Sequence, residues 1–259
     1  MAGMKSGLYP TNLSGHVLGL FLCFSISGDV WAVEPDAAKT LAGKAGDAIS
    51  LRTFEAVYKT SALGMTLDLK RSLTREGDIY TLSSRGKNML IDMNEFADFR
   101  IVNGGIEGIR FSSKVKSFKT NRRAVRFDQS AGVIDSMKRG DWTQHPWEPG
   151  VLDRFSQQQQ LRLTLIGEDV PPETLEFRVV DGPKVSDKRW QRLPDEVIET
   201  TMGQISTVKY RAVHTNPDKR ASEIWLAPDF DYLMVMTLHV ERSSIVKVII
   251  KSLSWLEGA

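Results

Sequence analysis

The sequence predicts a mainly β protein, in which the strands form a strongly curved antiparallel sheet or an open barrel with one packed helix near residues 152–166. Three observations lead to this fold class. Apolar and polar residues alternate over most of the chain after residue 50, which is typical of strands with one buried and one solvated face. Turn sequences follow at near-regular intervals, without the helices that a doubly wound α/β fold needs between its strands. Only one segment has a helical period instead.

The first 32 residues have the features of a secretory signal peptide. Lys5 precedes an apolar run of about ten residues, Val17 to Ile26, and the small residues Val30 and Ala32 stand at the third-last and last positions before a cut after Ala32. The run is shorter than the roughly 20 apolar residues of a membrane-spanning helix. We therefore predict export, cleavage after Ala32, a periplasmic location and no stable transmembrane segment after cleavage.

The one cysteine of the chain, Cys23, lies inside this leader. Cleavage would leave a mature chain without a thiol, which suits an oxidising compartment because no cysteine can mispair. Lipidation of Cys23 is disfavoured, because Leu22 stands where lipoprotein signals need a small residue and the apolar run continues past the cysteine. Residues 33–50 are rich in Ala, Gly and charge and are predicted to be a linker or frayed lead-in, followed by a single β-rich domain over residues 51–259.

The strands and hairpins of this domain are expected from alternation and turn chemistry. Alternating residues predict strands over 54–59 and 65–70. Hairpin turns are expected at Asn103-Gly104-Gly105, at residues 128–132 and at Met202-Gly203. The most apolar strands, 233–242 and 245–253, are joined by Ser243-Ser244.

Residues 152–166 are expected to form the helix. The apolar residues at 152, 155, 163 and 166 fall on one helical stripe, and the four glutamines at 157–160 favour a helix over a strand. Asp153 is a candidate N-cap directly after Pro149-Gly150. Leu161 and Leu165 widen the stripe, so the helix is expected to pack deeply, across the concave side of the sheet.

The composition excludes several classes of protein. With 34 Lys and Arg against 32 Asp and Glu, the net charge of +2 is not that of a dedicated nucleic-acid binder. A charged fraction of 25% with 41% hydrophobic residues is typical of a globular chain. The main basic cluster is interpreted as a solvated face or, more weakly, as a basic rim for anionic lipid headgroups or glycans. It consists of Lys114, Lys116, Lys119, Arg122, Arg123 and Arg126, with Phe118 and Phe127 interleaved.

No catalytic, cofactor-binding or metal-binding motif emerges from the sequence. The histidines of the predicted mature chain, His145, His214 and His239, lack the i, i+4 spacing of a zinc site, and there is no Gly-x-Ser-x-Gly elbow. His239 alternates with apolar residues and is expected at a surface or edge. Gly104-Gly105-Ile-Glu-Gly108 is followed by alternating residues, so it predicts a hairpin and not a phosphate-binding loop.

Two further constellations have ordinary structural explanations. Asp229 and Asp231 could serve as paired carboxylates, but Pro-Asp turn chemistry between two strands explains them more simply. Trp142 and Trp147 flank His145 in a predicted loop, where anchoring a long connection to the core is favoured over stacking on a ligand.

Three stretches resemble an exported bacterial family known as domain of unknown function 3108. They are Asp153-x-Phe155-Ser156 with Leu161-Arg162, then Glu199-Thr200-x-Met202-Gly203-x-Ile205-x-Thr207-Val208, and Ile224 to Asp229 followed by Tyr232-Leu233. The resemblance covers roughly residues 52 to 253. One departure is Leu233-Met234-Val235, where the family often has Leu-Pro-Val, and this substitution permits an ordinary paired strand. The resemblance implies a periplasmic, mainly β protein without a known catalytic constellation, similar in architecture to curved-sheet carriers of lipoproteins and lipids.

The leading hypothesis is a non-catalytic periplasmic protein that binds a lipid or other amphiphilic ligand, or an envelope partner, on the concave face. In it, Asp153, Ser156 and Arg162 hold the helix to the sheet, although capping and a surface ion pair would also explain them. The alternative is a structural or interaction protein of the envelope without a ligand pocket. An envelope hydrolase, based on Asp229, Asp231 and the histidines, ranks last. No cofactor is expected, and Trp225, Trp142 and Trp147 complete the candidate structural or ligand-adjacent residues.

Overall fold

The computed structural model describes residues 50–62, 65–242 and 244–256. The predicted signal peptide, and the predicted linker except its last residue, lie outside the described residues. The strands of the described part are β1 (Phe54–Ala62), β2 (Met65–Glu76), β3 (Ile79–Lys87), β4 (Asp92–Val102), β5 (Gly105–Lys116), β6 (Thr120–Asp128), β7 (Val133–Lys138), β8 (Asp141–Pro146), β9 (Val151–Asp153), β10 (Thr174–Asp181), β11 (Lys184–Thr200), β12 (Gly203–Ala212), β13 (Arg220–Ala227), β14 (Leu233–Glu241) and β15 (Ser244–Trp255). The helices are α1 (Gln157–Gly167) and the short 3-10 helix η2 (Pro228–Phe230).

All fifteen strands belong to one large, open and curved sheet, which confirms the predicted mainly β fold class. Its order is β8-β7-β6-β5-β4-β3-β2-β1-β15-β14-β13-β12-β11-β10-β9, so the first and last strands pair at its middle. Neighbouring strands are antiparallel except β9 and β10. The predicted hairpins are present. In the turn between β4 and β5, Asn103 and Gly104 both have positive φ, as a two-residue hairpin with the twist of its strands requires.

The curl of the sheet brings the β10–β11 turn against β7 and β8, close to the other edge. The backbone N–H of Gly182 donates to Ser136 Oγ at 2.8 Å, and His145 Nε2 donates to the carbonyl of Gly182 at 2.9 Å. Gly182 has a φ of +61°, and a Cβ there would lie 2.6 Å from Lys138 Cβ, so only glycine fits. Side-chain contacts, rather than a strand ladder, thus join the two ends of the sheet at this point.

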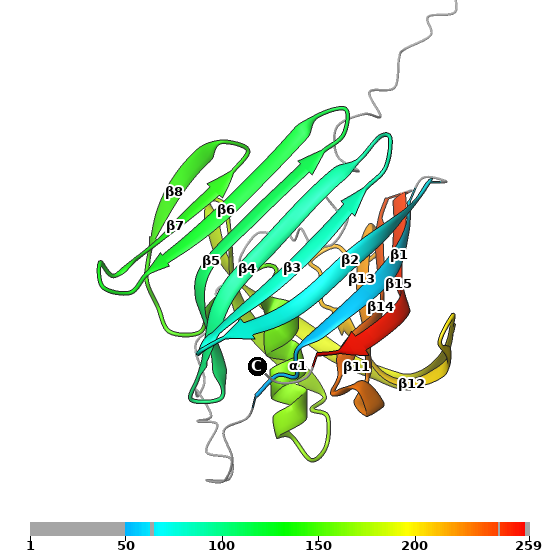
Figure 1. The fold of residues 1–259 in the computed structure, drawn as a ribbon. Helices are drawn as coiled ribbons and strands as arrows, with labels where there is room; N and C mark the ends of the chain where they lie inside the picture. Colours follow the sequence, from blue (N-terminus) through cyan, green and yellow to red (C-terminus); the bar gives the residue numbers. More distant parts are fainter. Residues whose placement is uncertain (1–49, 63–64, 243, 257–259) are drawn as a thin grey trace, which may run out of the picture.

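Helix α1 lies between the two halves of the curled sheet and packs against β5, β10 and β14 (Figure 1). It begins later than predicted, because residues 151–153 pair in parallel with β10 and form β9. The prediction of Asp153 as the N-cap was therefore wrong, and Ser156 occupies that position. All four glutamines, 157–160, are buried, and Gln160 Oε1 accepts a 2.6 Å hydrogen bond from the backbone of Ile106 in β5. The helix is thus enclosed by the sheet on its polar side as well.

A row of polar residues crosses the concave face in neighbouring strands. We call it the polar belt; it consists of Arg71, Ser84, Glu95, Ser113, Arg123 and Lys138, each in register with the next. The first four are buried, and Ser113 Oγ donates to Glu95 Oε1 at 2.7 Å. Arg123 and Lys138 pair with Asp181 of β10 at 3.2 and 3.0 Å. The polar belt therefore connects one half of the sheet to the other.

Candidate functional site

Asp153 organises the chain between β9 and α1. Its Oδ1 accepts hydrogen bonds from the backbone of Phe155 at 2.7 Å and of Ser156 at 2.9 Å, and its Oδ2 accepts one from Ser156 Oγ at 2.7 Å. Burial raises the pKa of Asp153, although these hydrogen bonds oppose the rise. The carboxylate satisfies backbone donors that would otherwise be buried without a partner, which is a structural use of the residue.

Arg162 contacts a different part of the molecule from Asp153 and Ser156. Its side chain is 1% exposed, Nε donates to the carbonyl of Asp231 at 2.7 Å, and Nη1 donates to the carbonyl of Arg52 at 3.3 Å. Burial lowers the pKa of Arg162 to about 10, so the guanidinium stays charged at neutral pH. Asp153 and Ser156 thus contact each other directly before α1, whereas Arg162 contacts the segments around Asp231 and Arg52. That these three residues hold the helix to the sheet stays a prediction.

The three candidate tryptophans lie apart from one another. Trp147 is partly buried against the core, and Trp225 is buried in β13. Trp142 is half exposed, with the Arg126 guanidinium 5.0 Å from its ring centroid. The prediction of a loop around His145 was wrong, because residues 141–146 form β8 at the edge of the sheet.

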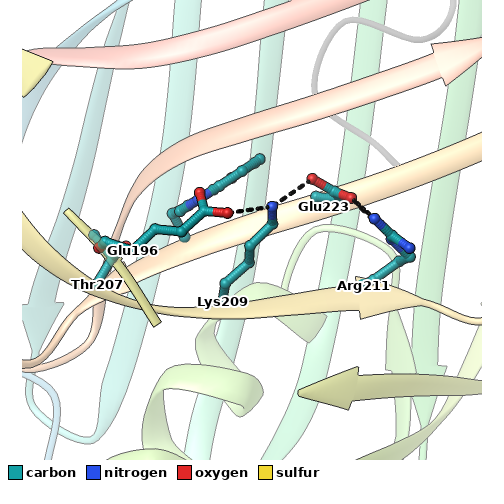
Figure 2. Close-up of polar contacts among 6 residues, drawn as sticks. Glu196, Thr207, Lys209, Arg211 and Glu223 are labelled. Carbon is teal, nitrogen blue, oxygen red and sulfur yellow. Dashed lines mark hydrogen bonds and ion pairs between the residues drawn. The ribbon is translucent and has the colours of Figure 1, made fainter. Parts of the chain in front are cut away.

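Strands β11, β12 and β13 contribute a network of ionic groups formed by Glu196, Lys209, Arg211 and Glu223 (Figure 2). Trp225 of β13 donates a hydrogen bond to this network. Lys209 Nζ lies 2.8 Å from Glu196 Oε1 and 3.1 Å from Glu223 Oε2, while Arg211 Nε donates to Glu223 Oε1 at 2.8 Å. Trp225 Nε1 donates to Glu196 Oε2 at 2.7 Å, and Lys209 Nζ lies 4.5 Å from a Trp225 ring centroid. A register shift in β11 around Pro194 directs Glu196 toward this group.

The pKa directions in this network indicate stabilisation rather than catalysis. Burial opposes the charge of Lys209, but the hydrogen bonds to Glu196 and Glu223 outweigh it and leave its pKa raised. Hydrogen bonds from Lys209 and Trp225 lower the pKa of Glu196. A nucleophilic lysine needs a lowered pKa, and a general acid needs a raised one. The shifts of Lys209 and Glu196 therefore favour their charged forms.

Replacing Lys209 by methionine is expected to lower the free energy of unfolding by about 2 kcal/mol, because Glu223 is largely buried and would lose one of its two cations. Arg189→Gln is the matched control, because it breaks an exposed ion pair with Glu176 and should cost less than about 1 kcal/mol. Urea unfolding monitored by circular dichroism measures both changes. Equal losses in the two variants would contradict this account.

A second polar group lies inside the sheet and was missed by sequence reasoning. Ser222 Oγ lies 2.7 Å from His239 Nδ1 and 3.1 Å from His214 Nε2. The expectation that His239 lies at a surface or edge was wrong, because β14 pairs on both sides and the side chain points inward, where it is buried. Burial lowers the pKa of each histidine to about 4, so both are neutral at pH 7. Alternation alone could not show which face of the strand is enclosed.

The two aspartates expected in a turn lie in and directly after η2. Asp229 is within this short helix, and Asp231 follows it with a φ of +51°. Asp231 Oδ2 forms ion pairs with Arg52 at 3.5 Å and Arg162 at 3.8 Å. The side chain of Asp231 is thus committed to two arginines.

The basic cluster predicted as a solvated face divides into two parts. Lys114, Lys116, Lys119 and Arg122 are exposed together, and Arg126 is exposed further along β6, next to Trp142. Arg123 points inward and pairs with Asp181. Pairing of β2 to β6 adds three exposed cations, Lys70, Arg85 and Lys87, to the exposed part. We call these seven residues the basic face: Lys70, Arg85, Lys87, Lys114, Lys116, Lys119 and Arg122. Sequence reasoning missed the first three because strand pairing unites them with the rest.

An open depression of about 800 Å³ lies on the basic face. Lys70, Arg85 and Lys87 line it, together with Val57, Asp68, Gly86, Asp92, Met93 and Asn94. It is open to solvent, unlike the enclosed cavity expected of an amphiphile carrier. Within the described part of the chain, no helix has the length and apolarity to span a membrane, and no cluster of metal-ligating side chains occurs.

Comparison with known proteins places this fold in a family. The family described as "Protein of unknown function (DUF3108)" matches residues 53–241, which cover β1 to β14. The chain belongs to the DUF3108 family. This confirms the resemblance seen in the sequence. A search of curated proteins found no match.

A solved structure similar to this DUF3108 protein is described as beta-barrel-like. A beta-barrel-like protein of domain of unknown function DUF1849 from Brucella abortus is 10% identical, with a TM-score of 0.50 over 80% of this chain and 99% of that one. A putative exported protein with a YmcC-like fold from Bacteroides fragilis is 9% identical over 79% of this chain and 96% of that one, and its TM-score of 0.29 carries no argument. The first likeness supports the curved, mainly β fold of the DUF3108 protein and says nothing about its activity.

Proposed function

We propose that this protein is a non-catalytic interaction protein of the cell envelope, exported to the periplasm, which acts through its outer surface. The observation that carries the proposal is the position of α1. The helix lies inside the curl, its first seven residues are buried, and the polar belt crosses the same concave face. A ligand in the concave face would have to displace these side chains. This favours the interaction protein over the amphiphile carrier.

The arrangement of titratable groups gives no support to a hydrolase. Asp231 is paired with two arginines, and the His214–Ser222–His239 group is buried, with both histidine pKa values well below neutrality. His145 contacts the β10–β11 turn instead. A hydrolytic site needs an acid and a base converging on one accessible position. These groups are dispersed over three parts of the fold.

Native mass spectrometry of the protein purified after export tests this proposal. We expect the mass of the polypeptide alone, beginning at Val33 if the leader is cleaved after Ala32, and no binding of a fluorescent fatty-acid probe. Saturable one-to-one binding of the probe would contradict the proposal if Leu161→Trp, inside α1, abolished it while Val170→Trp, at an exposed position, did not. That result would favour the carrier.

A further inference from the structure

Exposed apolar side chains lie at the tips of two neighbouring turns. Met89 is fully exposed and Leu90 is 51% exposed in the β3–β4 turn, and Phe118 is 83% exposed in the β5–β6 turn. The two turns are adjacent, because Asp92 at the start of β4 pairs with Lys116 at the end of β5, and both lie at the upper end of the sheet in Figure 1. We call Met89, Leu90 and Phe118 the apolar tips. Apolar side chains exposed together at one end of a molecule mark an interaction surface.

The basic face begins directly behind the apolar tips. Lys87, Lys116 and Lys119 flank the two turns, and Lys70, Arg85, Lys114 and Arg122 form a row one step further along the strands. Elsewhere in the fold, many cations are neutralised, as in the pairs Arg100–Asp78 and Arg110–Asp98. Among the described residues, no acidic side chain forms an ion pair with any of the seven cations of the basic face.

Two acidic side chains lie within the basic face. Asp92 is in register between Lys87 and Lys116, so it offsets part of their charge. Asp68 and Asp92 line the depression of the basic face, but Asp68 is already engaged by Lys251 Nζ at 2.7 Å. The depression is open to solvent and lined by Lys70, Arg85 and Lys87. It could therefore receive a phosphate group without a rearrangement of the core.

We propose that this end of the molecule docks on an anionic phospholipid surface, with the apolar tips in the interface and the basic face against the headgroup phosphates. The proposal rests on the interaction function proposed above and names its partner. The order of the apolar tips and the cations favours a lipid surface as the partner. A bilayer presents anionic phosphates outside and hydrocarbon beneath, which matches cations set behind protruding apolar side chains. An acidic protein would match both groups only if it carried an apolar patch at the corresponding position.

Vesicle sedimentation tests the charge requirement. The protein should sediment with phosphatidylglycerol/phosphatidylethanolamine vesicles and stay in solution with phosphatidylcholine vesicles, and rising salt should release it. Lys87→Glu/Lys116→Glu should weaken apparent binding by at least about tenfold, since each basic residue near an anionic surface contributes several-fold. The matched control is Arg75→Glu/Arg189→Glu, which changes the net charge equally at exposed positions away from the basic face and should bind within about twofold of the unsubstituted protein.

A single fluorescent label tests insertion of the tips. In a Cys23→Ala background the chain has no other cysteine, so Met89→Cys can be labelled alone with an environment-sensitive fluorophore. Anionic vesicles should shift its emission to the blue, and the same label at Val197→Cys, exposed in β11, should not shift. Met89→Ser/Phe118→Ser should reduce sedimentation at least about fivefold, whereas Val170→Ser/Val197→Ser should leave it unchanged.

Absence of sedimentation with anionic vesicles at low salt would overturn the lipid assignment, as would a Met89 label that keeps its emission. Specific retention of an acidic envelope protein by the basic face, without vesicle binding, would also overturn it while leaving the interaction function in place. Failure of the interaction function itself has a different signature, which is the stoichiometric fatty-acid probe binding described above.

Discussion

Replacing Arg162 by alanine is expected to lower the free energy of unfolding by about 3 to 4 kcal/mol. The side chain is almost fully buried and donates to the carbonyls of Asp231, directly after η2, and of Arg52, directly before β1, so it joins both segments to α1. Its guanidinium also lies 5.7 Å from the Phe54 ring centroid and 5.6 Å from the Trp255 ring centroid. Truncation removes both hydrogen bonds, leaves the Asp231 carboxylate with one fewer cation and opens a cavity among aromatic rings.

Urea unfolding of Arg162→Lys separates the contribution of the guanidinium geometry from that of the positive charge, and Arg100→Ala serves as a control. Arg162→Lys keeps the charge but cannot donate to two carbonyls in the same fork, so most of the loss should remain. Arg100→Ala removes an exposed arginine that pairs with Asp78 and should cost less than about 1 kcal/mol. A loss below about 1 kcal/mol in Arg162→Ala would show that the contacts of Arg162 do little to hold α1 in place.

Lowering the pH from 7 to 5 is expected to cost about 3 kcal/mol of unfolding free energy through His214 and His239. Burial lowers the pKa of each from 6.5 to about 4 in the folded state. The unfolded chain therefore binds more protons between these values, and stability present above pH 6.5 is lost as the pH falls toward 4. Nearby cations reinforce the effect, because Arg220 opposes protonation of both histidines, whereas Glu241 favours it.

Urea unfolding at pH 7 and at pH 5 measures this difference in unfolding free energy. Both pH values lie above the pKa values of ordinary carboxyl groups, so these groups contribute little to it. His214→Gln should remove about half of the pH dependence, and histidine NMR signals should identify which rings stay neutral at pH 5. An unfolding free energy that is equal at pH 7 and pH 5, together with histidine signals that titrate near 6.5, would disprove the buried neutral pair.

Local patterns predicted the strands and hairpins well, because turn chemistry and alternation act between residues that are close in the chain. The β4–β5 turn at Asn103-Gly104 is an example, since the required positive φ values are a property of those residues themselves. The start of α1 was less predictable. Leu152 and Asp153 fall within the predicted helix, but the backbone groups of residues 151–153 pair with residues 178–180 in β10. A partner so distant in the chain leaves no local signal.

The candidate residues were predictable in kind but not in arrangement. Trp225 and Arg162 stand out in the sequence as a large aromatic residue and an arginine within an apolar stripe, yet their partners come from other elements. Trp225 Nε1 donates to Glu196, which lies in β11, and Arg162 contacts η2 and the chain before β1. The burial of His239 was also unpredictable from the sequence, because it depends on how the whole sheet curls.

The sequence by itself determined the fold class, the absence of a recognisable catalytic motif and the family. These depend on periodicity, turn residues and motif spacing, which are properties of short segments. Only the tertiary structure decided which polar residues are enclosed and which face solvent. Arg123 and Arg122 are neighbours in one basic run, but the first pairs with Asp181 inside the curl and the second joins the basic face. The reason is that successive side chains of a strand point to opposite faces, and curvature decides which face becomes the interior.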